Sequence, residues 1–185
     1  MKNRKLTFIL LLNFVLASCG FHLRGSQDLS SVLPEVQLQG VNNHSELGRA
    51  LIEALSEAKI NVLDESDILL NIKPETFSKR VLSLDVNGLA NQYELNYHLG
   101  FSVIRKVAKA NTDENSQQKI VEIVPMQSIT EKREYLFDAN LVLVKANEEI
   151  QLNNDMRVAA MLQLVRRLKY LMRNALKINK AKITK

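Results

Sequence analysis

Eleven consecutive residues, 93–103, alternate strictly between apolar and polar side chains. The odd-numbered positions are large and apolar, while the even-numbered positions are polar or glycine: Tyr93, Leu95, Tyr97, Leu99, Phe101 and Val103 against Glu94, Asn96, His98, Gly100 and Ser102. Residues two apart point to the same face of a strand, so this pattern predicts one long strand with a buried face and a hydrated face. The fold is therefore expected to contain a sheet that is covered on one side only.

A predicted hairpin leads into this strand. Asn87 and Gly88 separate the strand from segment 77–85. Asn-Gly is typical of a two-residue hairpin turn in which both turn positions have positive φ. Alternation predicts a strand at 35–39, and a continuous apolar run predicts another at 68–72. Two apolar segments, 120–124 and 129–137, are predicted to form a second hairpin around Pro125. Segment 108–119 has no apolar period and is expected to be an exposed connection.

Two further stretches have helical spacing. The first places five apolar residues on one face: Leu47, Leu51, Ala54, Leu55 and Ala58. Asn43 or Ser45 is the expected N-cap, and Glu46 could complete a capping box with Asn43. The second, 147–176, lacks proline and glycine and is amphipathic. Residues 141–144 fit either the end of a strand or the start of this helix. The predicted fold class is α+β, with two helices packed on one face of a mostly antiparallel sheet.

The first 19 residues have the layout of a bacterial export signal. Lys2, Arg4 and Lys5 precede an apolar run of twelve residues, 6–17, which is shorter than the ~20 residues of a membrane-spanning helix. The run ends in Leu-Ala-Ser-Cys, which resembles the lipobox that precedes lipid attachment to cysteine. Cys19 is the only cysteine of the chain and occupies the lipidated position of this motif.

These features predict four segments. They are a signal peptide that is removed (1–18), a lipidated tether (19–33), a folded α+β domain (34–176) and a basic tail (177–185). Cys19 is expected to carry an N-acyl group and an S-diacylglycerol. Gly20 follows the lipid site where inner-membrane lipoproteins of enterobacteria carry Asp, so the predicted location is the periplasmic face of the outer membrane.

The charge of the chain is concentrated at its C-terminus. The last twenty residues hold eight basic and no acidic side chains, although the mature chain of 167 residues is close to neutral, with 22 basic and 20 acidic ones. A basic segment of this kind suits nucleic acid, but a lipid-anchored exported domain does not meet nucleic acid. Cations are also expected near a helix C-terminus, where they lie in water or contact anionic lipid headgroups.

Catalytic and metal-binding motifs are absent from the sequence. The three histidines, His22, His44 and His98, lie far apart and outside any HExxH motif, and no GxSxG or glycine-rich phosphate loop occurs. We therefore predict a protein that is not an enzyme and that has no metal and no cofactor beyond its covalent lipid.

Residues 19–25, Cys-Gly-Phe-His-Leu-Arg-Gly, resemble the start of the mature lipoproteins of the LptE family, which act in lipopolysaccharide assembly. Five later segments and the single residue Glu148 match the family in the same order: 31–40, 47–55, 92–95, 133–138, 148 and 163–168. The resemblance implies a non-enzymatic outer-membrane lipoprotein with two helices against a four-stranded sheet, which plugs the β-barrel protein LptD. The lumen of such barrels is polar, which fits the hydrated face predicted for 93–103.

The resemblance also implies contact with lipopolysaccharide through basic loop residues. Lys145 is the candidate matched by position, and four others are candidates by charge: Lys79, Arg80, Lys132 and Arg133. The turn at 85–88 departs from this expectation because it carries no cation. The alternative function is that of an autonomous periplasmic lipoprotein that binds lipid or cell-wall polymer without a barrel partner.

Overall fold

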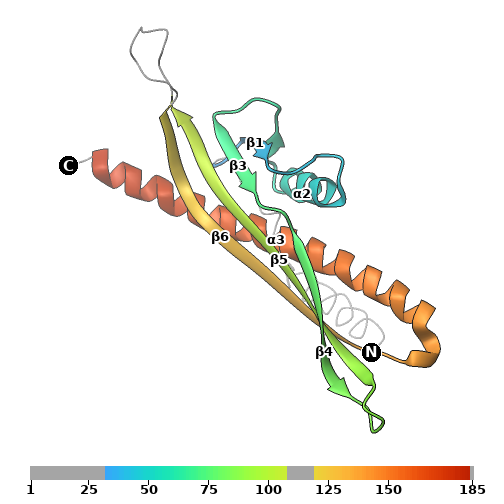
Figure 1. Cartoon of the computed structure of the whole chain (residues 1–185). Helices are drawn as coiled ribbons and strands as arrows, with labels where there is room; N and C mark the ends of the chain where they lie inside the picture. Colours follow the sequence, from blue (N-terminus) through green and yellow to red (C-terminus); the bar gives the residue numbers. More distant parts are fainter. Residues whose placement is uncertain (1–31, 108–118, 184–185) are drawn as a thin grey trace, which may run out of the picture.

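The computed structural model describes residues 32–107 and 119–183, which form a curled six-stranded sheet and two helices (Figure 1). The strands are β1 (Glu35–Gln39), β2 (Asn61–Val62), β3 (Ile68–Ile72), β4 (Thr76–Leu84), β5 (Ala90–Val107) and β6 (Lys119–Leu136). The helices are α2 (Glu46–Glu57) and α3 (Val142–Ile183), and α3 follows a short 3-10 helix, η1 (Ala139–Leu141). The signal peptide, Cys19, most of the tether and the connection at 108–118 lie outside the described residues.

Strand β5 organises the sheet. One of its edges pairs with β6 from Gln92 to Val107, and the other pairs first with β4 and then with β3, all antiparallel. The apolar face predicted for 93–103 is confirmed, because Tyr97, Leu99, Phe101 and Val103 are all fully buried. On the face predicted to be hydrated, Glu94 and Ser102 are buried as well. At 42 residues, α3 is about 63 Å long and matches the 18-residue β5, at about 60 Å.

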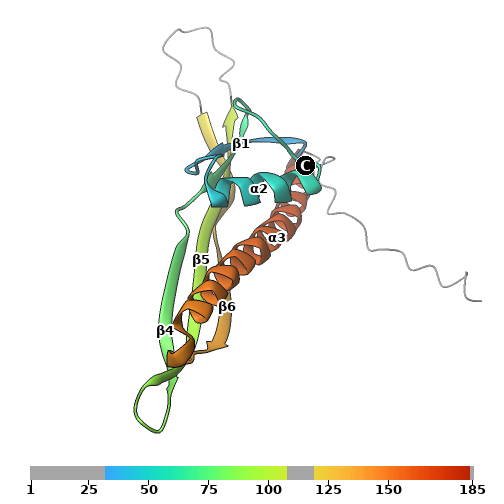
Figure 2. The same ribbon diagram turned by 90° about the vertical axis from the view of Figure 1, so that its right-hand side faces the viewer.

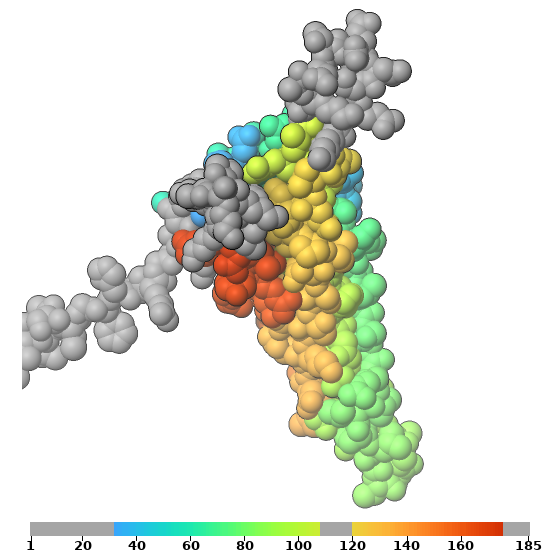
Figure 3. Space-filling view, turned by 90° about the vertical axis from the view of Figure 1, so that its left-hand side faces the viewer, coloured from blue at the N-terminus to red at the C-terminus, as the bar shows by residue number. Residues whose placement is uncertain are grey.

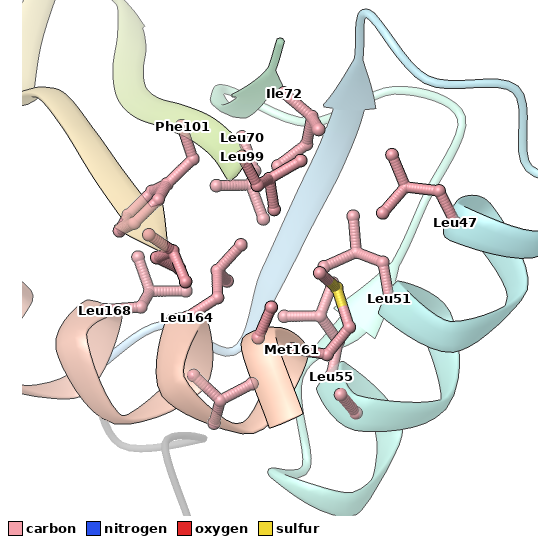
Figure 4. Close-up of a cluster of buried hydrophobic side chains, with 14 of the residues drawn as sticks. Leu47, Leu51, Leu55, Leu70, Ile72, Leu99, Phe101, Met161, Leu164 and Leu168 are labelled. Atoms are coloured by element: carbon pink, nitrogen blue, oxygen red, sulfur yellow. The ribbon is translucent and has the colours of Figure 1, made fainter. Parts of the chain in front are cut away.

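Both helices pack on one core at the same side of the sheet. Figure 4 shows Leu51 and Leu55 of α2 and Met161 and Leu164 of α3 pointing toward one another and toward the sheet. Figure 2 shows α2 and α3 together on one side, and no described element covers the opposite face of β4, β5 and β6. The predicted class, α+β with two helices, is confirmed. Within the described chain, neither helix combines the length and hydropathy needed to cross a bilayer.

The number of strands differs from the four that were expected. The sheet has six, and β1 pairs in parallel with both β2 and β3. The α2 helix connects β1 to β2 as a crossover, which is the connection that parallel strands require. Hairpin signals in a sequence report antiparallel neighbours only, so they could not reveal these pairs.

The hairpin predicted around Pro125 is wrong, because β6 runs through it as a single strand. Between Phe101 and Val103 of β5, which face Gln127 and Val124 of β6, one residue of β5 lies opposite two residues of β6, so one extra residue bulges out at Pro125. Among the described strands, β6 pairs only with β5. Proline is tolerated at bulges and on edge strands, where its missing N–H is not needed.

The β4–β5 hairpin is confirmed, but its turn is wider than a two-residue Asn-Gly turn. Gly88 has φ of 78°, whereas Asn87 is not among the described residues with positive φ. The Asp85 carboxylate closes the loop by accepting hydrogen bonds from the backbone N–H groups of Asn87 and Leu89, both at 2.8 Å. Side-chain capping thus replaces the backbone geometry that a tight turn would need.

The helix ends settle two alternatives left open by the sequence. Ser45 is the N-cap of α2, and its Oγ accepts a hydrogen bond from the Gly48 N–H at 3.0 Å. Residues 141–144 are helical, because η1 leads directly into α3 at Val142. The α3 helix then continues beyond Leu176 to Ile183, within the segment predicted as a tail.

Gly48 is required where α2 begins. A Cβ at this position would lie 2.1 Å from the Asn42 carbonyl oxygen and 2.8 Å from the Asn43 Cα. Gly48→Ala is therefore expected to lower the free energy of unfolding by about 2 kcal/mol, although alanine favours a helix interior. Urea denaturation measures the change, with Ser56→Ala at an exposed site of α2 as a control within about 0.5 kcal/mol. A Gly48→Ala variant as stable as the parent would show that the capping loop does not approach this closely.

Candidate functional site

The uncovered face of β4, β5 and β6 carries a ladder of polar side chains. The even-numbered residues of β5 lie opposite polar partners on both neighbouring strands: Arg80, Glu94 and Glu134 in one row, then Ser78, Asn96 and Lys132, then Thr76, His98 and Thr130. Directly paired residues point to the same face of a sheet, so these rows form one surface, which we call the open face. Figure 1 looks onto it, with α3 behind the strands. The hydrated face predicted from the alternation is therefore present over these rows, where His98 is exposed and Asn96 is half-buried.

Arg80 and Glu94 form the strongest contact of the open face. The Arg80 Nε and Nη2 donate to the two carboxylate oxygens of Glu94 at 2.7 and 3.1 Å, and the Asn96 amide donates to Glu94 at 2.9 Å. The hydrogen bond from Arg80, followed by that from Asn96, lowers the pKa of Glu94 from 4.5 to about 2. The residue is thus held ionised and fixed in position at neutral pH.

The same face also offers neutral hydrogen-bonding groups. His98 Nδ1 lies 3.2 Å from the Ser128 hydroxyl and 3.4 Å from the Thr130 hydroxyl, and Gln92 donates to Glu134 at 3.2 Å. His98 and Thr130 are exposed, so both remain accessible to a partner. The open face thus combines positive, negative and neutral hydrogen-bonding groups along a long strand pair. Such a surface suits contact with a polar protein surface better than contact with lipid.

Arg80 controls the ionisation of Glu94, which gives a titration test. The folded-state pKa of Glu94 lies below its ordinary value of 4.5, so this carboxylate stabilises the fold above about pH 4.5 and loses that effect as the pH falls toward 2. In Arg80→Gln the pKa of Glu94 is expected to rise toward 4.5, as measured by carboxyl carbon NMR. Lys79→Gln is the matched control, because Lys79 contacts Glu149 instead and should leave Glu94 unchanged. A Glu94 pKa near 4.5 in the parent protein would contradict the assignment.

Lys79 lies on the other face of β4 and is enclosed by aromatic rings. Its ammonium is 2.5 Å from the Glu149 carboxylate of α3 and 4.1 Å from the centre of the Tyr93 ring. The Tyr135 hydroxyl donates to the same carboxylate at 2.6 Å. Partial burial opposes the charged form of Lys79, but the hydrogen bond to Glu149 and the attraction between the charges outweigh it, so the pKa of Lys79 is raised. This cation joins α3 to the sheet.

The five predicted ligand cations do not share one surface. Lys79 and Arg133 lie opposite Leu95 on the helix-covered face, whereas Arg80 and Lys132 belong to the open face. Lys145 lies in the first turns of α3. Arg133 lies 3.6 Å from Glu131, Lys145 lies 2.7 Å from Glu148, and Lys132 makes no ion pair with a described residue. Four of the five charges are thus partly neutralised within the chain.

Large apolar side chains are exposed at one end of the molecule, where the β4–β5 hairpin, the end of β6 and the start of α3 come together (Figures 1 and 2). Val86 at the hairpin tip is fully exposed, and Leu143 is 82% exposed. The others are Val81, Leu82, Leu84, Leu89, Leu136, Leu141, Val142 and Val144. We call this set the apolar end. Exposed apolar side chains gathered at one end of a fold are typical of an interaction surface.

Arg157 connects three elements and was not singled out by the sequence analysis. It is only 8% exposed and pairs with Glu46 at the start of α2 and with Glu75 just before β4, both at 3.0 Å. Its guanidinium also lies 5.3 Å from the centre of the Phe77 ring. In the sequence, Arg157 is an arginine next to the apolar stripe of the second predicted helix. Arginines that lie in solvent have the same position, so this feature did not distinguish it.

Comparison with known proteins decides the family. A family model described as LptE, lipopolysaccharide-assembly, matches residues 33–168. The chain belongs to the LptE family. Members of this family are non-enzymatic lipopolysaccharide-assembly lipoproteins, so the resemblance and the non-enzymatic character predicted from the sequence are confirmed.

Relatives and solved structures agree with this assignment. Proteins named LPS-assembly lipoprotein LptE are 27% identical to this chain in Photorhabdus laumondii and 28% identical in Yersinia pestis. Each match extends over 173 residues and covers 91% of this chain. It covers 87% of the Photorhabdus protein and 77% of the Yersinia protein. An uncharacterized lipoprotein B from Nitrosomonas europaea superposes with a TM-score of 0.60 at 25% identity, covering 85% of this chain and 96% of its own. Rare lipoprotein B from Shewanella oneidensis shares the fold, with a TM-score of 0.52 at 20% identity, over 82% of this chain and 99% of its own. The lipid site at Cys19 and the five ligand cations stay predictions for this LptE-family chain.

Proposed function

We propose that this chain is an outer-membrane lipoprotein that plugs the LptD β-barrel, supports its assembly and takes part in the transport and insertion of lipopolysaccharide. In this proposal residues 1–18 are removed and Cys19 carries the lipid at the periplasmic face of the membrane. Residues 19–33 form the tether, 34–176 the plug domain and 177–185 a basic extension. Family membership supports the role in lipopolysaccharide assembly.

The open face is the observation that carries the plug proposal. Its rows of charged and hydrogen-bonding side chains lie along β5 and β6, which have 18 residues each. The lumen of a wide outer-membrane barrel is polar, so a plug must present hydrogen-bonding groups rather than apolar ones. A sheet with one face buried under α3 and the other polar meets that requirement over the three rows from Glu94 to His98.

The elongated shape supports the same function. The α3 helix is about 63 Å long, given its 42 residues, whereas the apolar band of an outer-membrane barrel is about 25 Å tall. A domain of this length can cross the lumen and still extend into the periplasm. It could therefore receive a ligand outside the barrel and reach its interior.

Lipopolysaccharide contact is proposed at the apolar end and its neighbouring cations. Lipid A combines acyl chains with phosphates, and the exposed leucines and valines there lie next to Lys145 in the sequence and in α3. Arg80 and Arg133 can pair with phosphate through two parallel hydrogen bonds, whereas Lys79, Lys132 and Lys145 act as point charges. Phosphate binding by Arg80, Arg133, Lys79 or Lys145 would compete with the carboxylate that each already contacts.

The apolar end also favours a second candidate function. An exposed apolar surface can bind lipid directly, which suits an autonomous lipid-binding or cell-wall-binding lipoprotein without a barrel partner. The two candidates differ in stoichiometry. The plug requires a permanent barrel partner, whereas the autonomous lipoprotein is stable alone.

Purification of the tagged protein from a detergent extract of membranes tests the plug proposal. A large outer-membrane β-barrel protein is expected to co-purify in near-equal molar amount, as quantified by mass spectrometry. The same tag on an unrelated outer-membrane lipoprotein is the control for nonspecific capture. Isolation of the chain as a monomer from the same extract would refute the plug and favour the autonomous lipoprotein.

A further inference from the structure

A groove lies between β6 and the second half of α3, away from the open face and the apolar end. Its volume is about 480 Å³, and it is lined by Gln127, Gln163, Arg166, Arg167, Tyr170 and Leu171. Figure 3 shows these parts of β6 and α3 side by side on one surface of the molecule. Arg167 is held at the groove by a hydrogen bond from its guanidinium to the Ser128 carbonyl oxygen of β6.

The positive charge at this groove is not neutralised within the described chain. Neither Arg166, Arg167 nor Arg173 makes an ion pair with a described residue, in contrast to Arg80, Lys79 and Lys145 at the other end of the fold. The sequence explains this difference, because no acidic residue occurs after Asp155. At the groove, an anion therefore meets two neighbouring arginines without displacing a carboxylate.

The groove also offers a hydrogen-bond acceptor and an amphipathic rim. The Gln163 Oε1 is buried and has no hydrogen-bond partner among the described residues. A ligand that supplies a hydroxyl donor would satisfy it, which a bare phosphate ester cannot do. Tyr170 is 67% exposed beside Leu171, and tyrosine is enriched at the interface between membrane and water. These features match a phosphate headgroup that bears a hydroxyl and is joined to apolar chains.

The position of the groove agrees with a membrane ligand. Figures 1 and 2 both place the start of β1 beside the second half of α3. Cys19 is thirteen residues before Val32 and, even fully extended, the intervening chain spans at most about 45 Å. A lipid on Cys19 would therefore hold this end of the fold close to the membrane surface.

We propose that the groove between β6 and α3 binds the headgroup of an anionic glycerophospholipid of the phosphatidylglycerol type, in the leaflet that holds the lipid anchor. Arg166 and Arg167 contact the phosphate, and a headgroup hydroxyl donates to Gln163. The contact orients the folded domain on the membrane. It rests on the proposed anchoring through Cys19 but not on the barrel partner.

Lipid titration of the mature full-length chain in dodecyl maltoside micelles tests this site. Phosphatidylglycerol is added at constant ionic strength, and backbone amide NMR shifts give both the location and the dissociation constant. Saturable shifts are expected at Gln127 and at 163–171, with none of comparable size for phosphatidylcholine, which is zwitterionic and has no headgroup donor. Arg166→Gln combined with Arg167→Gln is expected to raise the dissociation constant about tenfold or more, since each cation near a membrane surface contributes to binding of anionic lipid.

Matched variants make the outcome decisive. Arg49→Gln combined with Lys73→Gln removes the same charge at two exposed positions outside the groove and should change the dissociation constant less than twofold. Gln163→Met keeps the arginines and should weaken binding about threefold, so the site remains testable if the double arginine variant does not fold. Equal affinity for the two lipids, or an unchanged dissociation constant in both groove variants, would overturn the proposal. Purified protein without a barrel is used throughout, so a failed barrel pull-down leaves this result unaffected.

Discussion

The Cys19→Ala protein is expected to leave the membrane fraction almost completely and to accumulate either unprocessed or as soluble periplasmic protein. Each methylene of an acyl chain buried in a bilayer contributes about 0.8 kcal/mol, and attachment through more than one chain is effectively permanent. Removal of the thiol removes every chain at once, since Cys19 is the only cysteine. Cell fractionation measures the distribution, and mass spectrometry of the mature N-terminus reports the lipid.

A conservative change in the same motif controls for disturbed export. Ser18→Gly keeps a small residue before the cysteine and should leave membrane attachment and cleavage intact. Normal maturation and membrane retention of the Cys19→Ala protein would contradict the anchor and, with it, the proposed location.

The second large effect is expected at Arg157. Arg157→Ala should lower the free energy of unfolding by about 3 kcal/mol, because it leaves the carboxylates of Glu46 and Glu75 without their shared partner. The Glu75 side chain is only 20% exposed, so water replaces the lost contact poorly. Urea denaturation of the mature chain measures the change.

Two further variants distinguish the effect of this hydrogen-bond network on stability from the effect of removing a positive charge. Arg157→Lys keeps the charge but presents its donors from one nitrogen instead of the separate Nε and Nη1 that contact Glu75, Glu46 and Asn154. It should lose about half as much stability. Arg133→Ala removes an exposed cation and should change stability by less than about 0.5 kcal/mol. Equal stability of Arg157→Ala and Arg133→Ala would show that the three-element network does not hold the fold together.

The sequence predicted those parts of the fold that depend on local periodicity. Both helices and the long strand β5 follow from the spacing of their apolar residues, and the hydrated face of β5 follows from the same alternation. The parallel pairing of β1 with β3 depends on contacts between segments far apart in the chain, which local spacing does not encode. Pro125 was misread for a related reason, because only the edge position of β6 makes a proline acceptable there.

The candidate site was predictable in composition but not in arrangement. From their charge alone, Lys79 and Arg80 were equivalent candidates for ligand contact. Adjacent residues of a strand, however, face opposite sides of the sheet. Lys79 consequently contacts Glu149 of α3, and Arg80 contacts Glu94 on the open face. Which carboxylate each cation meets depends on strand register and on the path of α3, and both are tertiary properties.

Site-specific photo-crosslinking from the open face tests the plug most directly. A photoreactive residue is placed in intact cells at His98 or at Lys132, which are exposed on β5 and β6. We predict that both positions crosslink to one large outer-membrane β-barrel protein. A folded, membrane-anchored protein that gives no such crosslink from either position would contradict the account.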